Sequence, residues 1–149
     1  MPQTFTDNEG RDWILRVNPF TLGEIEERLG VSFSAAPEDQ EGPAIRIATD
    51  YLFCFRVIWV LVEKQAKERG LGSEDLGDAL VGEVMGKAQA ALCQALADFQ
   101  PDPNRRAAMG KMFSVIQQAE QAAVAKGVAV LDQLDIDKIV TEALSDAGT

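Results

Sequence analysis

Polar and apolar side chains alternate along the first twenty residues of the chain, and this pattern predicts β-strands. In the second of two such runs, Trp13, Leu15 and Val17 share one face. The runs are separated by residues 7–10, where Gly10 can close a tight turn because it adopts a positive φ without a steric penalty. We therefore predict a β-hairpin within residues 1–20. Since a two-stranded hairpin is only marginally stable in water, its apolar face must pack on helices or on another chain.

A helix start is predicted directly after the hairpin. Thr21 and Glu24 have the spacing of a capping box, in which the threonine side chain bonds an unpaired amide and the glutamate reaches back to the amide of the cap residue. Phe20 and Ile25 stand at the flanking positions of a hydrophobic staple. We therefore expect Thr21 to be the cap of this helix.

The same helix should end at Leu29, since Gly30 can take the left-handed conformation of a C-terminal cap. Residues 32–43 follow, with three acidic residues, two prolines and no basic residue. This composition predicts a mobile acidic linker. The glycine and carboxylate spacing of a calcium-binding EF-hand loop is missing, so we expect no metal there.

Apolar positions then recur with helical spacing in four segments, which are residues 44–69, 73–80, 82–99 and 104–131. The first of these segments is apolar nearly all round between Tyr51 and Val62, which is typical of a central, buried helix. The pattern as a whole predicts a mainly α (α+β) fold in a single domain, residues 1–149. In this fold the N-terminal β-hairpin packs on a bundle of four to five helices that spans residues 21–131.

Two apolar stripes are candidates for binding another protein. In the segment 104–131, Met109, Met112 and Ile116 recur at steps of three and four, which forms a narrow seam suited to pairing with another helix. Methionine side chains adapt well to irregular partner surfaces. The alternative is that this seam only completes the protein's own bundle.

The second stripe lies further along the sequence. Ile136, Ile139, Val140 and Leu144 fall on one helical face, and Asp135 suits the N-cap position. We predict an amphipathic tail helix over residues 135–145. This helix docks either on a partner or on the bundle of its own chain.

The charge of the chain narrows the choice of partners. It carries 24 acidic and 14 basic side chains, for a formal net charge of −10, which repels the phosphates of nucleic acids and anionic lipid surfaces. We therefore expect protein partners, with neither nucleic acid nor membrane among them. The apolar stretch from Tyr51 to Val62 is too short to span a bilayer, and Asp7, Glu9 and Asp12 stand where a signal peptide would be apolar. These features predict a cytoplasmic protein.

Reactive side chains are scarce in this sequence. It contains no histidine, which excludes histidine bases, histidine triads and imidazole metal ligands. Its two cysteines, Cys54 and Cys93, lie within apolar helical patterns and are expected to be buried, reduced thiols. No phosphate-binding glycine loop, nucleophile elbow or metal-ligand cluster is present. We therefore predict no catalytic residue, no cofactor and no metal, and hence a protein that is not an enzyme.

The hairpin contains the motif Phe-x-Asp-x-x-Gly-Arg-x-Trp, formed by Phe5, Asp7, Gly10, Arg11 and Trp13. With this start the chain resembles a group of small phage and prophage tail assembly chaperones, over about residues 4–105. Further positions that share the resemblance are Leu29-Gly30-Val31, Gln65-Ala66, Gly82, and Asp98-Phe99 followed by Pro101.

The resemblance implies a non-enzymatic factor that binds the tail tube subunit or the tape-measure protein and keeps it from assembling prematurely. It also implies a product of a prophage-like region that acts in the host cytoplasm, with or without a longer translational variant. An alternative of a different class is a structural or homo-oligomeric virion component of the tail or the head-tail region, which would stay in the particle. An enzyme is the third alternative.

Overall fold

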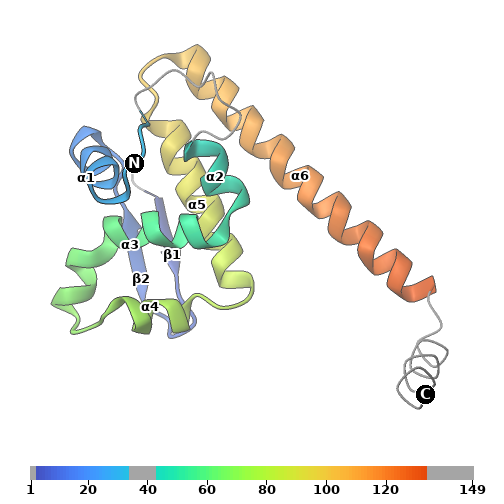
Figure 1. Ribbon diagram of the computed structural model, residues 1–149, viewed down its shortest axis with the longest axis horizontal. Coiled ribbons are helices and arrows are strands. Elements are labelled where there is room, and N and C mark those ends of the chain that lie inside the picture. Colours follow the sequence, from blue (N-terminus) through green and yellow to red (C-terminus); the bar gives the residue numbers. More distant parts are fainter. Residues whose placement is uncertain (1–2, 34–42, 134–149) are drawn as a thin grey trace, which may run out of the picture. The chain divides into compact units, whose positions relative to one another are not determined.

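The computed structural model of this protein describes residues 3–33 and 43–133, which form two strands and six helices. Figure 1 shows the strands β1 (Gln3–Thr6) and β2 (Asp12–Leu15) and the helices α1 (Pro19–Leu29), α2 (Pro43–Thr49), α3 (Tyr51–Glu68), α4 (Ser73–Ala79), α5 (Glu83–Phe99) and α6 (Pro103–Gln133). The predicted mainly α fold, with an N-terminal hairpin packed on helices, is confirmed.

Contacts divide the chain into two units, Met1–Ser114 and Val115–Thr149. The first unit contains the hairpin, helices α1 to α5 and the start of α6, and the second contains the rest of α6. The single domain over residues 1–149 stays a prediction. Most of the predicted acidic linker and the whole predicted tail helix 135–145 lie outside the described residues.

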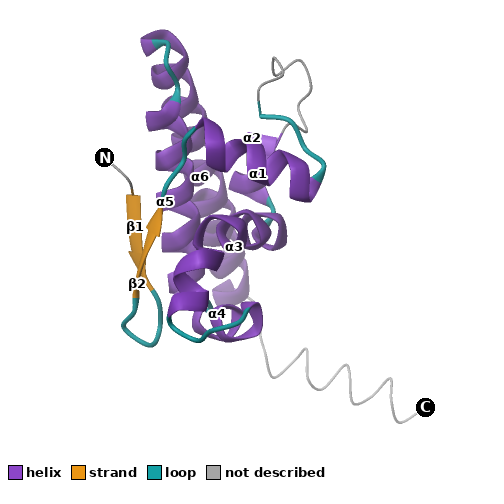
Figure 2. Ribbon diagram, turned by 90° about the vertical axis from the view of Figure 1, so that its left-hand side faces the viewer, coloured by secondary structure: helices purple, strands orange, loops and turns teal. Residues whose placement is uncertain are grey.

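The hairpin forms as the alternating pattern predicts. Its strands are antiparallel, with Phe5 opposite Trp13, and Gly10 closes the turn at φ +79°. Phe5, Trp13 and Leu15 are buried, because β1 packs on α5 and β2 packs mainly on α3. Figure 2 shows the hairpin as a layer beside these helices. Packing on helices therefore supplies the stability that two strands alone lack.

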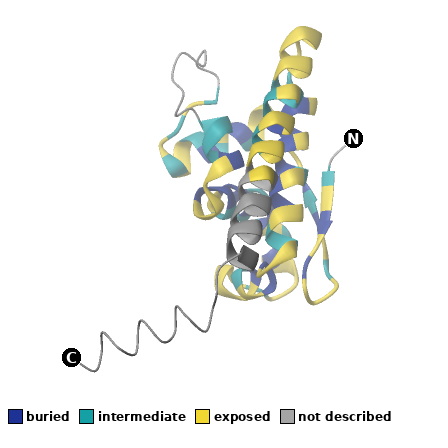
Figure 3. Cartoon of the chain, turned by 90° about the vertical axis from the view of Figure 1, so that its right-hand side faces the viewer, coloured by how far each residue is buried: buried dark blue, intermediate teal, exposed yellow. Residues whose placement is uncertain are grey.

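The core of the first unit is built from apolar residues of nearly every element. Figure 3 shows buried positions on the sides of the hairpin and helices that face one another. The largest fully buried side chains are Trp13, Leu15, Ile25, Ile47, Ile58, Leu76, Leu92, Val57, Val62 and Cys54. No helix within residues 3–33 and 43–133 is long and apolar enough to cross a membrane.

The start of α1 differs from the prediction. The cap is Asn18, whose side chain accepts a hydrogen bond from the amide of Thr21 at 2.9 Å, while the Thr21 hydroxyl accepts one from the amide of Asn18 at 2.9 Å. The capping box therefore lies three residues earlier than the Thr21–Glu24 pair. Pro19 explains the shift, since its fixed φ and missing amide suit the first helical position. Phe20 is 73% exposed and makes no hydrophobic staple.

The predicted helix over residues 44–69 is wrong, because the chain breaks into α2 and α3 at Asp50. The Asp50 carboxylate accepts hydrogen bonds from the amides of Leu52 at 3.1 Å and Phe53 at 3.2 Å, which caps α3. An aspartate that caps the following turn favours a helix start over continuation through its position. By contrast, α1 ends as predicted, with Gly30 in the left-handed conformation at φ +66°.

Candidate partner-binding surfaces

The seam predicted for partner binding lies on α6. Met109 and Met112, in the first unit, and Ile116, in the second, are each half-buried. Met109 and Met112 lie at a step of three on α6 and so share one of its faces, and the sequence continues this spacing to Ile116. Part of each side chain stays accessible. The other four predicted partner-binding residues, Ile136, Ile139, Val140 and Leu144, lie outside the described residues.

Phe113 belongs to the same face and was missed by the sequence analysis. It follows Met109 by four residues and precedes Ile116 by three, so the helical spacing already pointed to it. Its exposed fraction is only 9%, which places it at the buried centre of the stripe. Val115, on another side of the helix, is 56% exposed. The stripe therefore combines a buried aromatic ring with two flexible side chains, those of Met109 and Met112, that stay partly exposed.

A groove of about 570 Å³ lies between α1 and α3 in the first unit. Phe20, Val60 and Leu61 supply its apolar surface, and Phe20 is largely exposed. Sequence reasoning missed this groove because it forms between residues about forty positions apart. It can accept an apolar side chain of a partner beside the Phe20 ring.

Charged residues surround this groove. Glu63 forms ion pairs with Arg28 at 2.6 Å and Lys67 at 2.9 Å, and the bond from Lys67, followed by that from Arg28, holds the pKa of Glu63 below its ordinary value. Arg16 and Lys64 also line the groove and make no ion pair with any residue that the structure describes. The rim therefore mixes both signs of charge, in contrast to the strongly acidic chain as a whole.

Asp7 is the centre of a hydrogen-bond network in the hairpin. One carboxylate oxygen accepts from the amides of Glu9 and Arg11 at 2.9 Å each. The other accepts from Arg11 Nε and from the indole Nε1 of Trp13, both at 2.8 Å. Burial acts to raise the pKa of Asp7, but the bonds from the Arg11 and Trp13 side chains and from the two amides outweigh it and lower the pKa. Three residues of the sequence motif thus meet at one carboxylate.

Two side chains cover the outer edge of β2, one from α3 and one from the C-terminal cap of α3. Gln65 accepts from the amide of Ile14 at 3.0 Å and donates to its carbonyl at 2.9 Å, so the side-chain amide takes the place of a neighbouring strand. Arg69 donates to the carbonyl of Asp12 at 2.8 Å and stacks over the Trp13 ring at 4.5 Å. These contacts join residues more than fifty positions apart, which sequence spacing does not reveal.

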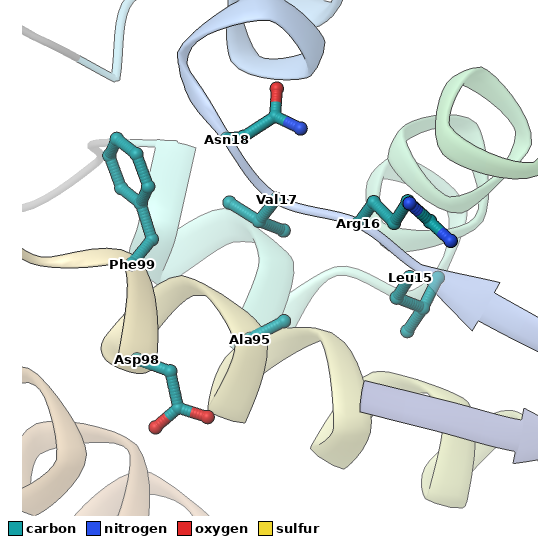
Figure 4. Close-up of a pocket in the computed structure, with 7 residues that line it drawn as sticks. All are labelled: Leu15, Arg16, Val17, Asn18, Ala95, Asp98 and Phe99. Carbon is teal, nitrogen blue, oxygen red and sulfur yellow. The ribbon is translucent and has the colours of Figure 1, made fainter. Parts of the chain in front are cut away.

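A second, smaller hollow of about 280 Å³ lies between the connection from β2 to α1 and the C-terminal end of α5. Figure 4 shows Val17 and Ala95 at this hollow, with the Asp98 carboxylate below them. Asp98 accepts hydrogen bonds from Gln94 at 2.8 Å and from Gln3 at 3.1 Å, and so ties α5 to the start of β1. No cation pairs with Asp98 in the described ranges.

The two cysteines are buried and form no disulfide, as predicted. Burial, with smaller contributions from nearby Cys93 and Asp50, raises the pKa of the Cys54 thiol far above its ordinary value. A thiol that stays protonated is a poor nucleophile, so Cys54 fills space in the core. Over residues 3–33 and 43–133, no three acidic or cysteine side chains are grouped so that they could hold a metal ion.

Comparisons of this chain with protein-family models, with curated proteins and with solved structures found no match.

Proposed function

We propose that this protein is a non-enzymatic assembly chaperone or adaptor of a phage or prophage tail. It binds the tail tube subunit or the tape-measure protein in the host cytoplasm and covers apolar surface that would otherwise assemble too early. The observation that carries this proposal is the apolar stripe of α6 within the first unit, where Met109 and Met112 remain partly exposed beside buried Phe113.

The stripe suits reversible binding of an apolar helix. A helix-in-groove contact uses apolar anchors at steps of three and four, which is the spacing of these residues. Methionine has three rotatable bonds and a polarizable sulfur, so it adapts to a partner whose own surface is irregular. The net charge of −10 favours a soluble complex by repulsion between complexes.

The hairpin also supports the proposal, because the residues of the family resemblance act together there. Asp7 bonds both Arg11 and Trp13, and Phe5 is buried opposite Trp13 on the other strand. The motif therefore describes one folded element, which is what a shared architecture requires. The hairpin thus supports the family resemblance, and the apolar stripe of α6 supports the binding of a partner.

The proposal is tested with purified partners encoded by neighbouring genes, the tail tube and tape-measure proteins. The full chain and the variants Met112→Gln and Ile116→Gln are titrated against each partner by calorimetry. We expect each variant to bind about tenfold more weakly, because a polar amide must then be desolvated at the contact. Gln117→Ala, an exposed position on the same helix, is the matched control and should change the Kd by less than about twofold. Unchanged binding by both test variants, or no binding to either partner, would contradict the proposal.

The predicted tail helix provides a separate test. Removing residues 135–149 should weaken capture of the partner and leave the far-ultraviolet circular dichroism per residue and the melting temperature nearly unchanged. A large loss of stability would instead place these residues in the protein's own core.

Mass spectrometry of purified particles distinguishes the proposal from a structural virion component. A chaperone stays behind in the lysate. Stoichiometric copies of this chain in the particle would overturn the chaperone proposal and favour the structural alternative.

A further inference from the structure

The two outer edges of the hairpin differ in how their backbone groups are satisfied. The amide of Asp7 donates to the carbonyl of Arg11 at 2.9 Å, so Asp7 and Arg11 form a hydrogen-bonded pair. Along an antiparallel ladder, such pairs alternate with pairs whose backbone groups point outward. From the register, the backbone groups of Phe5 therefore face β2, whereas those of Thr4 and Thr6 face away from it. By the same rule, the backbone groups of Ile14 face away from β1.

The edge of β2 is closed by side chains. Gln65 bonds both the amide and the carbonyl of Ile14, and Arg69 bonds the carbonyl of Asp12. These three bonds occupy the positions that an additional strand would use. A partner strand therefore has no free ladder on this side of the hairpin.

The edge of β1 is open. Thr4 and Thr6 are both exposed, and within the described part of the chain their outward amides and carbonyls have no hydrogen-bond partner. A row of unpaired backbone groups is a template for pairing with another strand. Natural edge strands often carry lysine or proline to prevent this, and β1, with the sequence Gln-Thr-Phe-Thr, carries neither.

Carboxylates lie near both ends of β1. Asp98 bonds the side chain of Gln3 at one end of β1, and Asp12 accepts from the Thr6 hydroxyl at 2.6 Å near the other end. Both aspartates are exposed and, in the regions described, neither is paired with a lysine or arginine. A second copy of the chain would bring another net charge of −10 to this edge, so an added strand with positive charge fits better.

We propose that the open edge of β1 binds an extended, basic segment of a partner protein, which adds a third strand to the hairpin. Backbone hydrogen bonds to Thr4 and Thr6 hold the segment, and a lysine or arginine beside Asp98 sets its orientation. The inference deepens the proposed function and rests on it in one respect, since the segment belongs to the partner that the chaperone captures.

The edge itself is tested with a probe that does not depend on the partner's identity. The probe is a fluorescein-labelled peptide, Lys-Thr-Val-Thr-Val-Lys, titrated against the full chain by fluorescence anisotropy. Thr4→Pro removes one outward amide, and proline is tolerated on an edge strand where the amide faces solvent. We expect this variant to bind the probe about tenfold more weakly than the unmodified chain. Thr4→Val keeps the amide and the β-branched shape, so it is the matched control and should bind within about twofold.

Charge is tested separately with Asp98→Asn, which keeps the size of the side chain. We expect about threefold weaker binding of the probe, and a smaller loss of affinity as salt is added than the unmodified chain shows. A peptide with glutamate in place of both lysines should bind the unmodified chain more weakly than the probe does.

Hydrogen exchange keeps the test independent of how the proline variant folds. In the unmodified chain, the Thr4 and Thr6 amides should exchange fast when free and slowly when the probe is bound. Absence of this protection, or equal affinity of Thr4→Pro and the unmodified chain for the probe, would overturn the inference. Self-association that Thr4→Pro abolishes would also overturn it, since a second copy would then occupy the edge.

The same variants separate this inference from the proposed function. If the tail proteins bind the chain but the probe protects neither amide, the strand site fails while the proposed function stands. If the probe binds the edge but neither tail protein binds the chain, the proposed function fails while the strand site stands.

Discussion

Replacing Asp7 by asparagine should destabilise this protein far more than the nearly equal size of the two side chains suggests. The oxygen that accepts from the amides of Glu9 and Arg11 can be kept, because the side-chain amide retains one oxygen. The other position becomes an NH2 group that faces two donors, Arg11 Nε and Trp13 Nε1, each 2.8 Å away in the native protein. Two hydrogen bonds are therefore replaced by donor–donor contacts.

The magnitude follows from the burial of those two donors. Trp13 is fully buried, so its indole N–H finds no water, and an unsatisfied buried donor costs about 1 to 3 kcal/mol. The Arg11 side chain is 27% exposed and can turn partly to solvent, which limits its contribution to about 1 kcal/mol. We expect Asp7→Asn to lower the free energy of unfolding by about 2 to 4 kcal/mol, and the melting temperature by roughly 5 to 15 °C.

Urea denaturation followed by circular dichroism measures this loss. Asp12→Asn is the matched control, because Asp12 is exposed and an amide oxygen can still accept from the Thr6 hydroxyl; its cost should stay within about 0.5 kcal/mol. In a Trp13→Phe background, which lacks the indole donor, Asp7→Asn should cost less than in the unmodified chain. If Asp7→Asn costs no more than Asp12→Asn, the network around Asp7 is not a source of stability and the reasoning is refuted.

The pH dependence of stability gives a second readout of the same group. The folded-state pKa of Asp7 is lowered from the ordinary value of 3.8. Its ionisation therefore contributes stability that is complete above pH 3.8 and is lost as the pH falls through the lower folded pKa. The difference in unfolding free energy between the unmodified chain and Asp7→Asn should shrink below pH 3.8. A difference that stays constant into this range would contradict the lowered pKa.

Three further predictions concern local contacts. Gln65→Ala should lower the free energy of unfolding by about 1 to 3 kcal/mol in urea titrations, because it leaves the amide and carbonyl of Ile14 without partners. The control is Lys64→Ala at the neighbouring exposed position, which should change the free energy of unfolding by less than about 0.5 kcal/mol. Equal effects of the two variants would contradict the role of Gln65. Asp50→Ala should lower the free energy of unfolding by about 1 kcal/mol in the same assay, because the cap of α3 is lost. An unchanged free energy of unfolding would show that Asp50 does not cause the break between α2 and α3. The Cys54 thiol should react with a thiol reagent much more slowly in the native chain than in urea, and similar rates in both would show that it is accessible.

Local patterns in the sequence were sufficient for much of the fold. Alternation placed the hairpin, and the turn needed only Gly10, whose positive φ depends on the residue itself. Gly30 ended α1 for the same reason. The apolar stripe of α5 and the seam of α6 followed from helical spacing, which also pointed to Phe113. The seam residues Met109, Met112 and Ile116 were therefore predictable as a shared face, although their half-buried state was not.

Local patterns failed where two signals of similar strength competed. We predicted Thr21 as the cap of the helix after the hairpin, whereas the structure uses Asn18, because Pro19 suits the first helical position that follows it. The apolar run from residue 44 onward hid a break, because Asp50 is one polar residue within a strongly periodic pattern. Propensity alone does not decide between such alternatives when each differs by only about 1 kcal/mol.

Only the tertiary structure decided how the hairpin is held and which of its edges is free. Gln65 reaches Ile14 across 51 positions, and Gln3 reaches Asp98 across 95. The groove beside Phe20 likewise exists only where α1 packs on α3. Periodicity records which face of an element is apolar, since that depends on neighbours along the chain. It carries no record of which distant polar group completes a hydrogen bond, because that partner is chosen by packing in three dimensions.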